Sequence, residues 1–171
     1  AYTEDASLFD MVLTDNQNGG YMATKHLINL GHRKILLAGS MPKAYPSIRE
    51  RRDGYLRAME EAGLEPIFAD SDLYAHSVQP AVREAFQRDA EISAVFTTND
   101  DLALAVMRTI RDLGKRVPDD VSVIGFDDIE LSKHVMPSLT TMSVDKVEMG
   151  QMAMNLLTSR IRNPEGGRVH S

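Results

Sequence analysis

The chain has 171 residues, of which 43% are hydrophobic, and a formal net charge of −6 at pH 7. This length and apolar content allow one ordinary domain or two small lobes with a sizeable core, while the acidic balance argues against a surface that binds nucleic acid, because duplex binding draws on Lys and Arg. The sequence has no apolar run of the ~20 residues that cross a membrane and no signal-peptide pattern at its start. It also has no cysteine that could form a disulfide or a thiolate metal site. We therefore expect a cytoplasmic protein.

Short β-prone runs alternate with longer amphipathic segments along most of the chain. The predicted strands span residues 10–14, 34–38, 65–69, 92–97, 121–125 and 139–144. The predicted helices begin near the capping residues Asn18, Ser47, Ser77 and Asn99 or Asp100, and a last helix spans 146–162. Such alternation predicts an α/β fold, with an open, mostly parallel, doubly wound sheet and helices on both of its faces.

Six phrases follow one another in an order that resembles regulators of the LacI/GalR family. They are DNQNGG at 15–20, HLINLGHRKI at 26–35, RRDGY at 51–55, TNDDLA at 98–103, VPDDVSVIGFDD at 117–128 and PSLTT at 137–141. The resemblance implies a periplasmic-binding-protein-like effector domain of two α/β lobes, with a small molecule bound in the cleft between them. It also implies a helix-turn-helix headpiece that binds operator DNA.

The resemblance further predicts how the chain is divided. Residues 1–138 correspond to the second lobe of the effector domain, and residues 139–171 to a return strand and helix that belong to the first lobe. We expect the rest of the first lobe and the headpiece to lie outside residues 1–171. The helix at 146–162 would then lack its family partners, so we expect its apolar face to pack against a second chain.

Open α/β sheets bind ligands at the carboxyl ends of their strands, and the family's effector-binding positions fall there. The resemblance assigns Arg51 as the strongest site residue, because a guanidinium grips two neighbouring oxygens with a planar fork. The sequence alternative is a solvated charge in a basic run. If Arg51 faces the cleft, its replacement should weaken the effector response far more than folding.

Four further residues match effector-binding positions of the family. Asn18, Asn99 and Asp127 offer amide and carboxylate groups to ligand hydroxyls, and Tyr74 lies near an aromatic that stacks on a sugar or base. The alternatives are helix caps for Asn18 and Asn99, a loop-closing turn for Asp127 and a plain surface position for Tyr74. Lys146 would favour an acidic effector if it entered the cleft.

Apolar side chains outside the predicted core favour a homodimer. Leu104 and Met107 lie off the inward stripe of their helix, and Val135 and Met136 lie in a loop before a proline. The resemblance places these segments at the family's dimer surface. A two-fold contact would reuse one patch on both subunits.

These features predict the effector-sensing domain of a transcriptional regulator that binds a sugar or related metabolite. We expect no cofactor, no metal site, no membrane contact and no enzymatic activity, because a catalytic nucleophile motif, a phosphate-binding glycine loop and an acidic metal cluster are absent from the sequence. The alternatives are a periplasmic sugar-binding protein of a transport system, which shares the two-lobed fold, and an α/β enzyme that acts on a small metabolite.

Overall fold

The computed structural model describes residues 9–41 and 43–163. The chain divides into two compact units, one made of residues 16–143 and one made of residues 1–15 together with 144–171.

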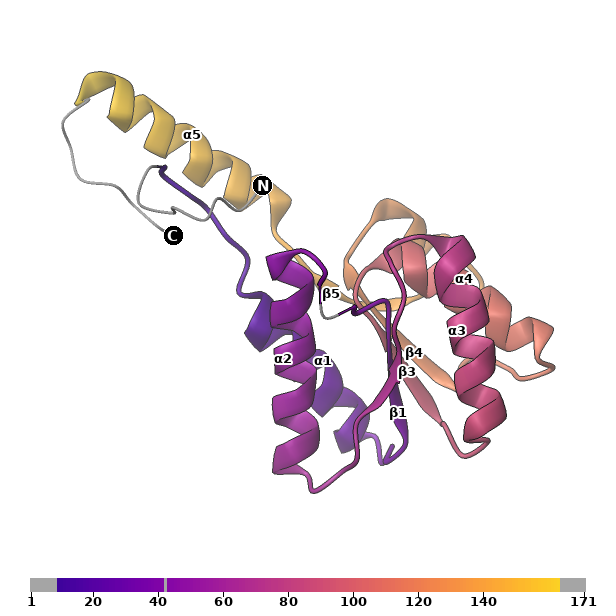
Figure 1. Ribbon diagram of the computed structural model, residues 1–171. Coiled ribbons are helices and arrows are strands. Elements are labelled where there is room, and N and C mark those ends of the chain that lie inside the picture. Colours follow the sequence, from indigo (N-terminus) through magenta and orange to yellow (C-terminus); the bar gives the residue numbers. More distant parts are fainter. Residues whose placement is uncertain (1–8, 42, 164–171) are drawn as a thin grey trace. The chain divides into compact units, whose positions relative to one another are not determined.

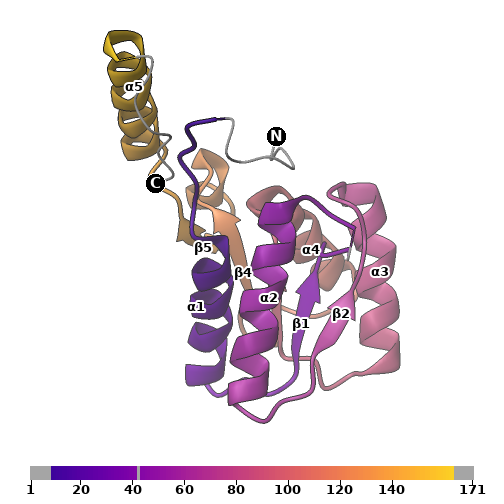
Figure 2. The same cartoon turned by 60° about the vertical axis from the view of Figure 1, so that its left-hand side comes forward.

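The larger unit is a parallel sheet with helices on both faces, as the sequence predicts. Within the described residues its strands lie in the order β2-β1-β3-β4-β5, and every neighbouring pair is parallel. The strands are β1 (Ile35–Ala38), β2 (Ile67–Ala69), β3 (Ala94–Thr97), β4 (Ser122–Asp127) and β5 (Thr140–Ser143). The helices are α1 (Asn16–Asn29), α2 (Pro46–Glu61), α3 (Ala75–Arg88) and α4 (Asp100–Asp112). Figures 1 and 2 show α1 and α2 side by side on one face of the sheet, and α3 and α4 on the other.

The sheet is covered on both faces because every residue of β1, and every residue of β3 except Thr97, is apolar. All four residues of β1 and all four of β3 are buried, which is typical of parallel strands between two helix layers. On the α3 and α4 side the core is a continuous cluster that includes Leu36, Val95 and Ile110. On the other side, Leu27 and Tyr55 are fully or nearly fully buried.

Several predicted boundaries differ from the structure. Residues 10–14 do not form a strand: only Met11 makes an isolated bridge, because β propensity without a paired neighbour does not fix a strand. Pro80 lies inside α3 and not in its first turn, because the helix begins at Ala75. The first residue of α2 is Pro46, a favoured place for proline, so Tyr45 and not Ser47 precedes the helix. A short 3-10 helix at Glu130–Lys133 was not predicted.

The smaller unit contains α5 (Lys146–Arg162), whose bounds agree with the sequence prediction. Asp145 caps the helix by accepting a hydrogen bond from the Glu148 amide at 2.8 Å. Arg160 makes a two-pronged ion pair with Asp10, at 3.0 Å from Nε and 2.8 Å from Nη2. None of the residues of α5 is buried, and Val147 and Ile161 are each 71% exposed. Packing of this helix against a second chain stays a prediction.

Candidate functional site

The carboxyl ends of β1, β3 and β4 bring polar groups together at one edge of the sheet. The strand order reverses direction between β1 and β3, and ligands of doubly wound sheets bind outside such a switch point. Thr98, directly after β3, donates from Oγ1 to the Gly39 carbonyl after β1 at 2.7 Å. This hydrogen bond holds the two strand ends close together, so the backbone is fixed at the switch point.

Arg51 lies beneath this edge and connects three elements. From α2 its Nε donates to Asn16 Oδ1 at 3.0 Å, its Nη1 donates to the Thr98 carbonyl, and its Nη2 pairs with Asp127 Oδ1 at 3.1 Å. The guanidinium also lies over the Phe126 ring, 3.7 Å from its centroid. The residue is only 7% exposed. Arg51 is therefore an inward-facing charge that holds the carboxyl ends of β3 and β4, and the alternative of a solvated charge is wrong.

The glycine and tyrosine that follow Arg51 explain how it reaches this place. A Cβ on Gly54 would collide with the Gln17 carbonyl, and a Cβ on Gly20 with the carbonyl of Arg51 itself, so both glycines let α1 and α2 pack backbone to backbone. Tyr55 then donates its hydroxyl to the Ile35 carbonyl at 2.8 Å. Burial raises the pKa of Tyr55 well above its usual range. The RRDGY phrase thus packs α2 on the sheet and orients Arg51.

Asp127 ends β4 in a backbone conformation that is rare for a residue with a side chain. Its φ is 106°, and that of Asp128 is 48°. The Asp127 side chain keeps 32% exposure while it pairs with Arg51, so it remains accessible to a ligand hydroxyl. Asp128 instead accepts a hydrogen bond from Ser143 Oγ at 3.1 Å, which ties it to β5.

The two asparagines differ in their positions. Asn99 is the N-cap of α4 and accepts a hydrogen bond from the Leu102 amide at 2.8 Å, as one of the predicted alternatives states. Asn18 is not a cap, because α1 begins two residues earlier at Asn16. Asn18 is exposed and lies 3.7 Å from the Met22 sulfur. Both remain candidates for ligand contact, Asn99 beside Asp127 at the strand ends and Asn18 in the first turn of α1.

Tyr74 borders a hollow that lies between the loops after β1 and β2. The hollow has a volume of about 630 Å³ and is lined by Met41, Lys43, Ala44, Tyr45, Pro46, Ser71, Asp72, Leu73 and Tyr74. The Tyr74 side chain is 63% exposed, and its ring stacks on His76 with the centroids 5.6 Å apart. Apolar and aromatic walls with a few polar groups are typical of small-molecule sites.

Sequence reasoning missed three polar residues that shape this edge. Asn16 is buried and links Arg51 to α1, with its amide donating to Glu50 at 3.0 Å. Arg52 donates to Ser40 Oγ at 3.0 Å and to Asp70 Oδ1 at 2.6 Å, which joins the loops after β1 and β2. Asp100 is completely buried. The signal that was available is their place within three of the phrases that the sequence singles out, at 15–20, 51–55 and 98–103.

The four residues expected at a dimer surface fall into two groups. Met107 is only 7% exposed and belongs to the core, and Leu104 and Val135 pack against the same core as half-buried residues. The expectation that these three are left over after the core is counted is therefore wrong, because the buried face of α4 is wider than one stripe. Met136 is 90% exposed, as expected.

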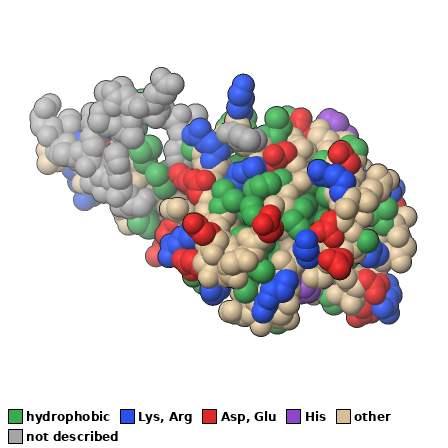
Figure 3. Space-filling view, turned by 60° about the horizontal axis from the view of Figure 1, so that its bottom comes forward, with side chains coloured by type: hydrophobic (Ala, Val, Ile, Leu, Met, Phe, Trp, Pro, Cys, Tyr) green, Lys and Arg blue, Asp and Glu red, His purple; other side chains and the backbone are tan. Residues whose placement is uncertain are grey.

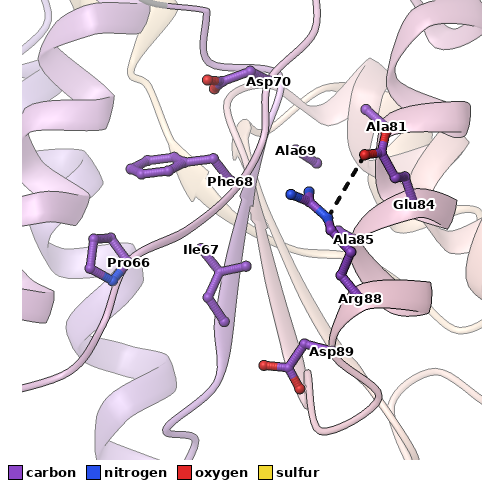
Figure 4. A pocket seen from close by; sticks show the side chains of 10 residues that line it. All are labelled: Pro66, Ile67, Phe68, Ala69, Asp70, Ala81, Glu84, Ala85, Arg88 and Asp89. Carbon is purple, nitrogen blue, oxygen red and sulfur yellow. Dashed lines mark ion pairs between the residues drawn. The ribbon is translucent and has the colours of Figure 1, made fainter.

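A second hollow runs beside the edge strand β2 and has a volume of about 550 Å³. Figure 4 shows Ala81, Glu84, Ala85 and Arg88 of α3 facing this strand, with Glu84 and Arg88 paired to one another. Small side chains on the helix leave the space open. Glu84 and Arg88 pair with one another, and the two other carboxylates that line the hollow, Asp70 and Asp89, pair with Arg52 and Lys34.

The described part of the chain has no group of three or more His, Asp or Glu side chains that could hold a metal ion. In the same residues no helix is long and apolar enough to cross a membrane. The face in Figure 3 has hydrophobic side chains gathered near the middle of the larger unit, with Lys, Arg, Asp and Glu interspersed around them. Positive and negative side chains are therefore mixed on this face.

Comparison with known proteins gives a family match over most of the chain. The family described as periplasmic binding protein-like domain matches residues 24–170. The HTH-type transcriptional repressor PurR of Aliivibrio salmonicida (strain LFI1238) is 38% identical over 164 residues, which cover 93% of this chain and 48% of the relative. PurR of Vibrio vulnificus (strain CMCP6) is 39% identical over 165 residues, with 94% and 48% covered. The chain thus spans about half the length of these curated relatives.

Solved structures agree with these relatives. A complex of the transcriptional regulator CelR with cellobiose superposes with a TM-score of 0.86 at 33% identity, over 96% of this chain and 51% of that one. A LacI family transcriptional regulator from Enterococcus faecium with bound ribose gives a TM-score of 0.86 at 30% identity, over 95% and 60%. A sugar-binding regulator of the LacI family from Escherichia coli, complexed with phosphate, gives 0.77 at 33% identity, over 84% and 52%.

Proposed function

Since this chain belongs to the periplasmic binding protein-like family and is an effector-binding domain of the LacI type, we propose that it binds a small polar metabolite at the carboxyl-end edge of its sheet. Binding there would modulate operator binding by a helix-turn-helix segment of the same protein. We further propose that the larger unit acts as the second lobe and that the return segment of the first lobe begins after residue 143. This is later than the position 139 expected from the sequence, because β5 pairs with β4 in the larger unit.

The observation that carries this proposal is the position of Asp127. Its carboxylate stands at the end of β4, partly exposed, and is held there by the buried Arg51. A fixed carboxylate beside an asparagine amide accepts and donates hydrogen bonds to neighbouring hydroxyls. This donor and acceptor set suits a sugar, and we propose Asp127, Asn99 and Asn18 as its polar contacts.

The hollow beside Tyr74 supports a ligand with an apolar ring face. Sugars present C–H groups that stack on aromatic rings, and Tyr45 and Tyr74 offer exposed rings in its wall. The matched regulators whose structures hold cellobiose and ribose favour a sugar as effector. Arg51 has its donors turned to protein acceptors, so we propose that it orients Asp127 and contributes to ligand binding mainly through it.

The relatives and matched structures are transcriptional regulators, which favours this function over a transport protein and over an enzyme. We propose that the domain catalyses no reaction and acts in the cytoplasm. We also propose a homodimer that includes Met136, since a two-fold contact would place two headpieces over paired half-sites.

The test is an NMR titration of the chain with ribose, cellobiose and inorganic phosphate in turn. Since the resemblance places the rest of the first lobe outside residues 1–171, we expect weak but saturable shifts of the Asn99 and Asp127 amides with at least one sugar, and loss of this response in Asp127→Asn. Asp53→Asn is the matched control, because Asp53 is an exposed carboxylate on α2 away from the strand ends. If none of the probes shifts these amides, the proposed site is wrong.

A further inference from the structure

The turn that presents Asp127 holds an unusual backbone conformation in two successive residues. Asp127 and Asp128 both have positive φ, 106° and 48°, although neither is a glycine. Residues with side chains keep such conformations only where the surroundings hold them, and these conformations cluster at ligand sites. Something in the larger unit must therefore hold this turn.

Asp100, the first residue of α4, accepts hydrogen bonds from the turn and from the strand beside it. Its Oδ2 accepts from the Ile129 amide at 2.9 Å, directly after the positive-φ pair. Its Oδ1 accepts from Thr141 Oγ1 on β5 at 2.6 Å. One carboxylate thus joins α4, the end of the turn and the neighbouring strand.

Strand β5 completes the support. Thr141 Oγ1 accepts a hydrogen bond from the Asp128 amide at 3.3 Å while it donates to Asp100. Ser143 Oγ donates to Asp128 Oδ2 at 3.1 Å. Asp128 is therefore fixed through its backbone and its side chain, and Asp127 is the member of the pair whose side chain turns to Arg51.

The close approach of Asp100 depends on the glycine in β4. A Cβ on Gly125 would collide with Asp100 Oδ1, so a larger residue there would push the carboxylate away from the turn. Asp100 itself is 0% exposed, which excludes it as a direct ligand contact. A buried carboxylate costs more to bury than an apolar residue, even with two donors and the positive end of a helix beside it. Packing alone therefore does not explain why a carboxylate lies at position 100.

We infer that Asp100 is a positioning residue, which fixes the Asp127–Asp128 turn and so sets the affinity of Asp127 for a ligand hydroxyl. The inference deepens the proposed function and rests on it for the ligand. The positioning itself is a property of the chain without ligand, so the two can be tested separately. Thr141 takes part as the second support of the same turn.

The experiment compares Asp100→Asn with Asp101→Asn in the 171-residue chain. Asparagine at 100 keeps the size but loses one of the two acceptor oxygens, whereas Asp101 is the exposed neighbour with the same charge. In Asp100→Asn we expect the Ile129 amide to exchange its hydrogen about 10- to 100-fold faster, as one charged hydrogen bond is lost. The amide-to-Hα coupling of Asp127, which depends on φ, should change, and the affinity for ribose or cellobiose should fall about tenfold.

A second pair of variants keeps the test valid if Asp100→Asn does not fold. Thr141→Val removes the hydroxyl and Thr141→Ser keeps it, so only the valine variant should change the Asp127 coupling. If exchange rises uniformly over the whole unit while the Asp127 coupling stays the same, Asp100 is merely structural and the inference is overturned. If the coupling changes but the unaltered chain binds neither sugar, the proposed function fails and the positioning stands.

Discussion

Replacement of Arg51 by alanine should destabilise the fold substantially as well as the site, whereas the sequence led us to expect a far larger effect on the effector response than on folding. The reason is the set of contacts around its guanidinium. The acceptors in Asn16 and Thr98 belong to residues that are 2% and 0% exposed, so water cannot easily replace the lost donors. The Phe126 ring also loses the cation above it.

The size of the effect follows from these contacts. Hydrogen bonds to charged groups contribute about 1.5–3 kcal/mol each, and the two buried acceptors lose their full share. Asp127 is 32% exposed, so water can replace the lost guanidinium there, and the loss of this ion pair adds little to the free energy of unfolding that is lost. We expect Arg51→Ala to lower the free energy of unfolding by about 3–5 kcal/mol, within the range for breaking a buried ion pair. Arg51→Lys keeps the positive charge but not the planar set of donors, and should lower the free energy of unfolding by about 2 kcal/mol.

The assay is urea unfolding followed by circular dichroism, with sugar binding measured in parallel. Arg49→Ala is the matched control, because Arg49 is an exposed arginine on the same helix and should change stability by less than about 0.5 kcal/mol. A loss below about 1 kcal/mol in Arg51→Ala would show that the buried contacts do not stabilise the fold, and would refute this reasoning.

Four other results are expected. Tyr55→Phe should cost about 1–3 kcal/mol in urea unfolding, since the Ile67 amide donates to its hydroxyl at 2.8 Å and would lose a buried partner; an unchanged midpoint contradicts this. Burial lowers the pKa of His32 below its ordinary 6.5, so the unfolded state binds the proton at a higher pH than the folded state does. The free energy of unfolding should therefore fall as the pH drops below about 6.5, and His32→Gln should make this pH dependence weaker. Met136→Asp should shift any dimer to monomer in sedimentation, and a dimer unaffected by it would exclude this surface. The acidic 171-residue chain alone should give no salt-sensitive gel shift with operator DNA.

The fold was predictable because its signals are local. Runs such as 34–38 and 92–97 are mostly apolar, as expected of parallel strands covered on both faces, and glycine and capping residues separate them from the helices. The bounds of α5 were predicted to the residue for the same reason. Residues 10–14 show the limit of this reasoning, because a strand also needs a neighbour to pair with, and the sequence does not say whether one is present.

The candidate site was predictable in its location but not in its internal contacts. Asp127 and Asn99 follow buried strands, which is enough to place them at the carboxyl-end edge. The orientation of Arg51 depends on partners 35, 47 and 76 residues away, and spacing along the chain does not report them. Met107 was misplaced because a helix that packs against both the sheet and a neighbouring helix, as α4 does with α3, buries more than the stripe that its period marks.

Asp127 is held by two buried charges of opposite sign that lie on different elements. Arg51 from α2 attracts its carboxylate, and Asp100 from α4 fixes the backbone that carries it. An acceptor fixed in this way needs no rearrangement when a hydroxyl arrives, so little binding energy is lost to ordering it. Tyr74 and Tyr45 lie in loops and are exposed, so they are free of such constraints. Recognition of a hydroxyl would then depend on the rigid strand ends, and the choice among sugars on the loop residues around the hollow.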